Sequence, residues 1–208
     1  PKNQFESTIQ IGITSDNGKN IGLIINSPVI ENLNTRFTIY SGQENGFREN
    51  VYQNNIDSNS KSEKLVRNKT IWSPTSNFQT VITSLIVDQD NKYDVWAPDN
   101  NELLQTYSNS NGKDSQNSKA ISIKNSWFNT GNKNLISITA YSINKSEHSY
   151  DGDWGNSDFW SQAPYNVDGW DYSAIETTLR DRSTFTQEFR LLENINNRSS
   201  FVLGIYFK

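Results

Sequence analysis

Apolar and polar residues alternate along most of the chain, so that successive side chains are expected on opposite faces of extended strands. The cleanest alternation lies in six segments, which are 5–13, 21–25, 36–40, 121–127, 185–191 and 201–207. Three more segments, 65–73, 78–88 and 135–145, alternate less cleanly but carry the same β-branched and aromatic residues. No segment combines a helical period with helix caps. The pattern therefore predicts an all-β fold of about nine strands.

The connections between these strands are alternately short and long. Four are short, at 27–35, 73–77, 129–134 and 193–198, and the three between them are long, at 43–64, 89–118 and 146–182. An antiparallel meander with this alternation has all its long loops at one end. Outer-membrane barrels have tight turns on one rim and large loops on the other, whereas a soluble sandwich has no reason to do so. The connections therefore favour an antiparallel transmembrane β-barrel.

Charged residues fall on the parity opposite to the apolar series. Arg36, Lys124, Glu188 and Arg190 all alternate with apolar neighbours and are expected to face a barrel lumen. A lysine or arginine facing lipid at the bilayer midplane costs about 2–4 kcal/mol. In 65–73 the same rule points Asn68 toward lipid, which departs from the pattern. A soluble amphipathic sheet shows the same parity, so this feature alone does not separate the two architectures.

Composition removes several classes of protein. The 208 residues include no cysteine and no methionine, which excludes disulfides, thiolate metal sites and a cysteine nucleophile. A net charge of −4 gives no basic surface for nucleic acid. No stretch approaches the about 20 apolar residues of a transmembrane helix. The hydrophobic fraction of 33% is low, but aromatics at 12% are too many for a disordered chain.

Several motifs resemble the barrel portion of the TonB-dependent outer-membrane receptors. The most specific pair is STFTQEFRL at 183–191 followed, after a short turn, by FVLGIYF at 201–207. The stretch INSPVIENLNTR at 25–36 is similar to an early periplasmic turn of that family, and NGFREN at 45–50 and WSP at 72–74 are similar to segments that follow it. The ordered set extends over about 25–207.

The resemblance implies that residues 1–208 are part of a larger barrel of about 22 strands. On this interpretation the plug domain, the TonB box and the C-terminal closing strands lie outside the chain. The implied function is TonB-dependent uptake of a scarce nutrient, such as an iron–siderophore complex, a vitamin or an oligosaccharide, across the outer membrane of a Gram-negative bacterium. The implied partners are outer-membrane lipid, the TonB complex acting through the plug, and the nutrient, with no cofactor. Arg36, Lys124, Glu188 and Arg190 would then contact the plug.

Catalytic chemistry has little support in the sequence. The single histidine, His148, is expected in an exposed loop, and no second histidine is present to share a metal. No G-x-S-x-G nucleophile elbow occurs. An enzyme is therefore not expected, and an all-β hydrolase ranks third among the functions considered.

An acidic loop offers a weak calcium candidate. Asp151, Asp153 and Asp158 have the spacing of calcium ligands in DGDWGNSD, but the sixth-position glycine and closing glutamate of an EF-hand loop are missing. A solvated acidic loop is the simpler interpretation, so no metal is expected.

The region 150–172 is rich in aromatic residues, which suit stacking on a sugar, a catecholate or another planar ligand. The candidate ligand-binding residues are Tyr150, Trp154, Trp160 and Trp170, together with Trp96 from the preceding long loop. Packing of a long loop against itself would require the same residues. The second function considered, a secreted all-β carbohydrate-binding module, would use these aromatics as a sugar platform.

Overall fold

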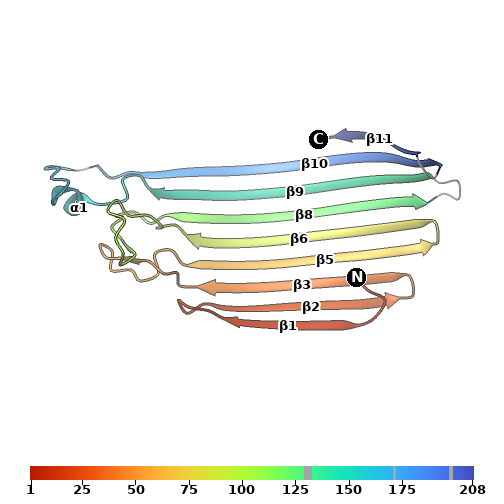
Figure 1. Ribbon diagram of the computed structural model, residues 1–208, viewed down its shortest axis with the longest axis horizontal. Helices are drawn as coiled ribbons and strands as arrows, with labels where there is room; N and C mark the ends of the chain where they lie inside the picture. The colour runs from red at the N-terminus through yellow and green to blue at the C-terminus, as the bar shows by residue number, and fades with distance from the viewer. Residues whose placement is uncertain (129–132, 171, 197–198) are drawn as a thin grey trace.

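The nine long strands form one sheet in which the strand order follows the chain (Figure 1). The computed structural model describes residues 1–128, 133–170, 172–196 and 199–208. The sheet contains β1 (Glu6–Ile13), β2 (Lys19–Ile30), β3 (Leu33–Glu44), β5 (Lys61–Thr75), β6 (Phe78–Lys92), β8 (Lys113–Phe128), β9 (Lys133–Asp151), β10 (Ile175–Asn196) and β11 (Ser199–Phe207). Every neighbouring pair is antiparallel. The predicted all-β fold with nine strands is therefore confirmed.

The strands run further than the sequence pattern indicates, and the long loops are shorter. The third long connection covers 152–174 instead of 146–182, and the second covers 93–112 instead of 89–118. The extra strand residues are mostly polar on both faces, so no alternation marks them, yet backbone pairing continues through them. The longest strand, β10, has 22 residues, whereas about 9–11 suffice to cross a bilayer. The long strands therefore exceed the length that a bilayer crossing requires.

The expectation of no helix is wrong at one place. One helix of five residues, α1 (Ser157–Ser161), lies in the third long connection. Asn156 caps it, because its Oδ1 accepts a hydrogen bond from the Phe159 amide at 2.9 Å. A single turn is too short to show a helical period in the sequence. Among the described residues, no helix is long and apolar enough to cross a membrane.

Cross-strand register separates the sheet into two faces. Residues opposite each other on neighbouring strands share a face, and Ile9, Leu23, Ile39, Val66 and Ile86 form one continuous apolar row across five strands. We call this side the apolar face. The other side, the polar face, carries all four residues predicted to face a lumen, which are Arg36, Lys124, Glu188 and Arg190. These four residues thus have the predicted parity, whereas Lys119, which lies opposite Ile86 and Ile143, is on the apolar face.

The sheet is a single layer without a hydrophobic core. Within the described residues, Ala97 is the one apolar side chain that is buried. Ile11 is 76% exposed and Leu203 is 61% exposed. A β-sandwich would bury such residues between two sheets about 10 Å apart. The secreted carbohydrate-binding module is therefore not favoured, because its sandwich architecture is absent from the described chain.

Polar side chains on the apolar face bond to each other across strands. Asn68 does lie on this face, as its parity predicted, and its Nδ2 donates to Thr35 Oγ1 at 2.9 Å. Thr70 Oγ1 donates to Asn68 Oδ1 at 3.1 Å. The departure from the apolar pattern is thus compensated locally, because these hydrogen bonds need no water.

The first residues of the chain cross the polar face. Asn26 lies opposite Arg36 on that face. Its Oδ1 accepts a hydrogen bond from the Lys2 amide at 2.6 Å, and its Nδ2 donates to the carbonyl oxygens of Lys2 and Gln4.

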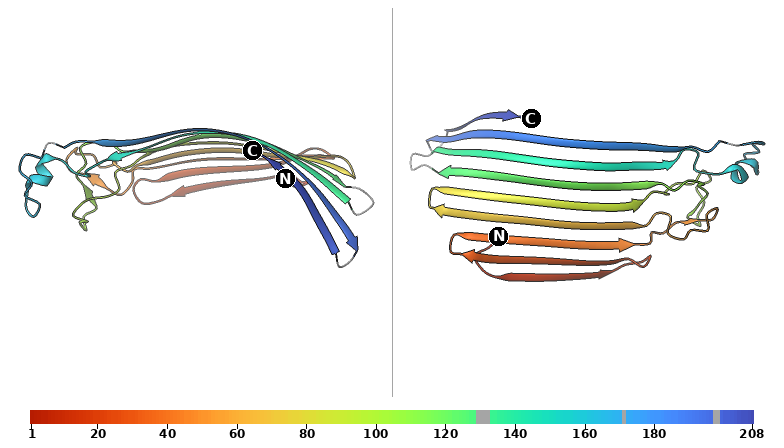
Figure 2. Two further views of the ribbon diagram at one scale, coloured as in Figure 1. Left: turned by 90° about the horizontal axis from the view of Figure 1, so that it is seen from above. Right: turned by 180° about the vertical axis from the view of Figure 1, so that it is seen from behind.

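Seen from above, the sheet is bowed and the loops with α1 extend toward its concave side (Figure 2).

The face assignment predicts how a new charge acts. Ile121→Lys places a cation on the apolar face of β8 and should destabilise the membrane-inserted protein by about 2–4 kcal/mol. Ser122→Lys places the same cation on the polar face one residue later and should cost much less. Denaturant unfolding of the protein in lipid bilayers measures both. A larger loss for Ser122→Lys would show that the two faces are assigned the wrong way round.

Candidate functional site

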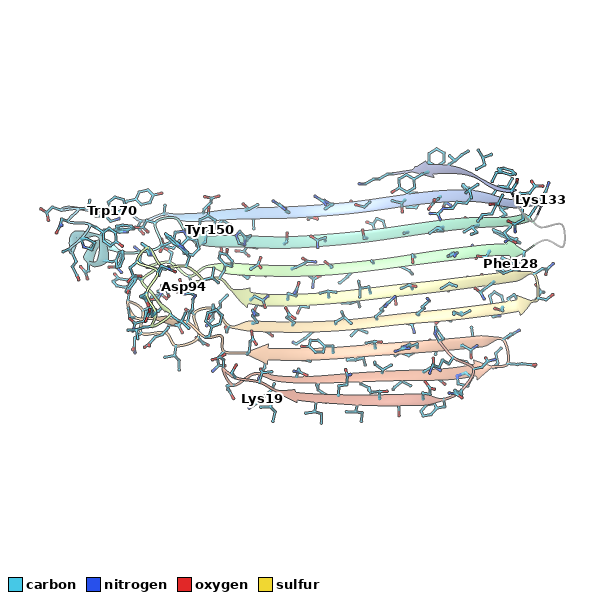
Figure 3. All side chains as sticks on the ribbon, in the orientation of Figure 1. Lys19, Asp94, Phe128, Lys133, Tyr150 and Trp170 are labelled. Carbon is cyan, nitrogen blue, oxygen red and sulfur yellow. The ribbon has the colours of Figure 1, made fainter. Side chains whose placement is uncertain are left out.

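The three long connections lie together at one end of the sheet and interlock. Two-residue strands within them, β4 (Glu49–Asn50) and β7 (Gln105–Thr106), pair in parallel. The Asn109 amide donates to the Gly155 carbonyl at 3.1 Å, which ties the second loop to the third. Asp94, Tyr150 and Trp170, labelled in Figure 3, all lie at this end. The loops therefore form one assembly instead of three separate excursions.

A buried carboxylate holds the first two loops together. Asp94 is 4% exposed and accepts hydrogen bonds from Asn50 Nδ2 at 2.9 Å, Thr106 Oγ1 at 2.6 Å and Ser108 Oγ at 2.9 Å. Asn50 Nδ2 also donates to the Ser108 carbonyl. A charge buried in this way is tolerated because donors saturate both of its oxygens.

A second buried carboxylate, Asp151, shapes the start of the third loop. Its Oδ2 accepts from the amides of Asn109 and Ser110, and its Oδ1 accepts from those of Asp153 and Trp154. Trp154 has a φ of 56°, a left-handed conformation that costs a residue with a side chain about 1–2 kcal/mol. The bond from its amide to Asp151 stabilises this strained conformation, which sets the direction of the indole.

The two neighbouring aspartates have opposite pKa shifts. Burial, reinforced by the adjacent Asp153, raises the pKa of Asp151 to about 6 against the lowering effect of the Ser110 and Asp153 amides. Burial also opposes ionisation of Asp153, but hydrogen bonds from Asp151 and from the Trp170 and Trp160 indoles outweigh it and lower its pKa. Among the described atoms, Asp153 Oδ1 has no hydrogen-bond partner. Burial thus favours the protonated form of Asp151, while hydrogen bonds favour the ionised form of Asp153.

The predicted ligand-binding aromatics form two clusters. The Trp154 cluster contains Tyr93, Trp96, His148, Tyr150 and Trp154. In it, the Tyr150 and Trp154 rings stack with centroids 5.3 Å apart and planes at 12°. Trp96 contacts Trp154 edge-on and is 48% exposed. Three of the five candidates, Trp96, Tyr150 and Trp154, are thus brought together.

The Trp160 cluster contains Tyr107, Phe159, Trp160, Tyr165, Trp170 and Tyr172. Both remaining candidates, Trp160 and Trp170, donate their indole N–H to Asp153 Oδ2, at 3.0 and 2.9 Å. Their polar atoms are therefore engaged within the loop. The contacts in this cluster are those expected of loop packing.

The weak calcium candidate is only partly assembled. Asp151 and Asp153 are adjacent, but their oxygens accept hydrogen bonds from N–H groups, and Asp158 lies in α1. In the described part of the chain, no group of three histidine or acidic side chains could hold a metal ion.

The predicted loop position of His148 is wrong. His148 lies in β9, with its Nδ1 3.3 Å from Asp114 Oδ1 and its ring 4.6 Å from that of Tyr93. It was misplaced because the polar end of β9 lacks alternation.

Sequence reasoning also missed two rows of polar residues on the polar face. One row contains Gln89, Gln116, Ser146 and Arg180, and the next contains Asn91, Asp114, His148 and Thr178. These eight side chains line a hollow of about 300 Å³ beside the Trp154 cluster. Ser, Asn and Gln are so common in this chain that only the register distinguishes these positions.

Comparison with known proteins agrees with this architecture. No protein-family model matches the sequence, and no curated protein matches it. Among solved structures, the chain is similar to the ferric-catecholate import receptor Fiu from E. coli K12 in its open form, with 13% identity and a TM-score of 0.71 over 99% of the chain. The closed form of Fiu gives 12% identity and a TM-score of 0.69.

The chain has the fold of a TonB-dependent receptor barrel. It spans 34% of the Fiu chain, about a third. The resemblance noted from the sequence motifs is thus confirmed for the fold, and the open sheet matches a segment of that barrel's wall. Identity this low carries no information about the ligand of this segment.

The buried Asp94 predicts a specific loss of loop order. Asp94→Ala leaves three buried donors without an acceptor, at a cost of about 1–3 kcal/mol each. Hydrogen exchange of the 50 and 106 backbone regions should accelerate, while exchange in the membrane-spanning strands stays unchanged. The exposed Glu102→Ala, in the same loop, is the control and should leave exchange as it is. Unchanged exchange in Asp94→Ala would contradict the role given to this carboxylate.

The raised pKa of Asp151 predicts a measurable titration. Because burial raises the Asp151 pKa from its ordinary 3.8 to about 6, this residue's contribution to loop stability is greatest below its unfolded pKa. The contribution falls as the pH rises from about 4 to about 6. Tryptophan fluorescence of the folded protein should show a transition near pH 6 that Asp151→Asn abolishes. His148→Gln is the control for the nearby imidazole, and loss of the transition there would assign it to the histidine.

Proposed function

We propose that the chain is the wall of an outer-membrane receptor that takes up a scarce nutrient by TonB-dependent transport. The observation that carries this proposal is the barrel-wall fold, which has one largely apolar face and whose long loops gather at one end. An apolar face of this extent requires lipid, because the described chain has no second layer to cover it. The interlocked loops then lie on the outer surface of the cell.

The polar face would line the lumen, and a plug domain would fill it. Arg36 lies directly opposite Lys69 on this face, and neither forms an ion pair within the described residues. Like charges placed opposite each other are unfavourable unless something else compensates them. Carboxylates of a plug would do so. Glu188 and Arg190 bond to each other and would present a paired surface to the same domain.

The Trp154 cluster is the better candidate for ligand contact than the Trp160 cluster. Trp96 and Tyr150 keep exposed or half-exposed rings beside the hollow on the polar face, whereas Trp160 and Trp170 use their N–H groups within the loop. We assign no bond-making chemistry to any residue. Fiu is a ferric-catecholate receptor, so a ferric catecholate is one ligand to test here.

The proposed function predicts energised uptake. The protein expressed from its complete gene should fractionate with the outer membrane and support accumulation of its ligand. Inactivating TonB should abolish accumulation but leave binding at the cell surface. A panel of ferric siderophores, haem, cobalamin and neutral oligosaccharides provides the ligands. Accumulation that persists without TonB would refute the proposal.

A further inference from the structure

The hollow on the polar face is built mainly by two successive register rows at the loop end of β6, β8, β9 and β10. Its floor consists of the two polar rows, from Gln89 to Arg180 and from Asn91 to Thr178. Its volume of about 300 Å³ falls at the lower end of the range found for small-molecule sites. The hollow lies on the barrel wall itself, so strand pairing fixes its lining more rigidly than a loop tip could.

The next register row forms an aromatic wall that adjoins the hollow through His148, whose ring lies 4.6 Å from that of Tyr93 and 5.8 Å from that of Tyr150. Tyr93 lies in this row because its amide donates to the Gly112 carbonyl at 3.0 Å. This close approach requires glycine, because a Cβ at position 112 would lie 1.8 Å from the Tyr93 carbonyl oxygen. Tyr150 is the next residue of the row, and its hydroxyl donates to Glu176 at 2.6 Å. Trp154, whose backbone is strained, stacks on Tyr150 beside this row.

The lining is rich in groups that both donate and accept hydrogen bonds. Three amides and three hydroxyls stand among one guanidinium, one carboxylate and one imidazole. The amides and hydroxyls belong to Gln89, Asn91, Gln116, Ser115, Ser146 and Thr178. Such a surface suits a ligand that presents many hydroxyl groups, because each hydroxyl can also donate and accept. Aromatic rings beside it suit the C–H face of a sugar ring.

The charge around the hollow disfavours an anion. Within the lining, Arg180 is balanced by Asp114. The three loops above it, 45–60, 93–112 and 152–174, contain nine carboxylates and one cation, Arg48. An anionic ligand such as a ferric catecholate would approach through a field of its own sign. A neutral ligand meets no such barrier.

We infer that this hollow binds a neutral, polyhydroxylated ligand, of which an oligosaccharide is the chemical class. A sugar ring lies on the wall formed by Tyr93, Tyr150 and Trp154, and its hydroxyls bond to the two polar rows. The inference rests on the proposed function, since it names the ligand class of the same receptor. It assigns recognition to the barrel wall in addition to the loops.

The test measures binding to the protein from its complete gene in lipid nanodiscs. The probes are maltohexaose, xylohexaose and mannohexaose, with ferric tris(2,3-dihydroxybenzoate) as the anionic comparison. At least one hexasaccharide should bind with an affinity that changes little between low and high salt, because it carries no charge. Calorimetry gives the affinities.

Two variants and one matched control locate the site. Gln116→Ala removes an amide of the floor and should weaken saccharide binding about five- to tenfold, and Trp154→Ala should weaken it at least as much. The control is Asn117→Ala, which removes the side-chain amide of the next residue. Because that amide bonds to Asp88 on the opposite face of the sheet, its loss should leave the affinity within about twofold. Equal effects of Gln116→Ala and Asn117→Ala would overturn the site.

Two further outcomes overturn the ligand class. One is that no hexasaccharide binds, and the other is that the ferric catecholate binds and Gln116→Ala weakens it. Outer-membrane fractionation and TonB dependence are measured separately. A protein that passes those two tests but fails here retains the proposed function and loses only the saccharide assignment.

Discussion

The structure depends on a single-layer sheet having no interior of its own. Backbone hydrogen bonds are satisfied between neighbouring strands, but each side chain has only the outside of the sheet to face. What covers each face therefore decides which residues are allowed there. The apolar rows on one face and the charges on the other are two consequences of this one constraint. The Asn68–Thr35–Thr70 bonds are a third, because a polar group facing lipid must find its partners within the sheet.

This constraint also explains which parts of the fold the sequence reveals. Where one face of the sheet is apolar, every second residue is apolar, so the alternation in 121–127 and 185–191 identifies strands and the face on which each side chain lies. Toward the loops both faces of a strand are mostly polar, and the alternation disappears although the backbone pairing continues. Strand ends such as 146–151 in β9 therefore looked like loop, and His148 was misplaced with them. The position where the alternation ends was mistaken for the end of the strand.

The loop assembly could be predicted only in part. Aromatic residues stand out in a sequence, and the structure brings three of the candidates, Trp96, Tyr150 and Trp154, together. The groups that position them do not stand out. Asp94 bonds to a residue 44 positions away, and Asp151 reaches back 42 positions to the Asn109 amide. Such contacts depend on strand register, which places distant loops side by side, and composition gives no sign of it.

Register also separates the fold of the wall from what the wall recognises. Along the middle of the strands, one apolar and one polar face restrict the residue classes, and the fold is shared with Fiu at 13% identity. Toward the loops that restriction ends, and the rows containing Gln116 and His148 are free to take any polar residue. The nine carboxylates of the loops are equally independent of barrel construction. The residues that recognise the ligand are therefore expected in these loop-end rows, whose residue types the barrel fold does not restrict. The proposal of a neutral ligand rests on these rows and not on the fold.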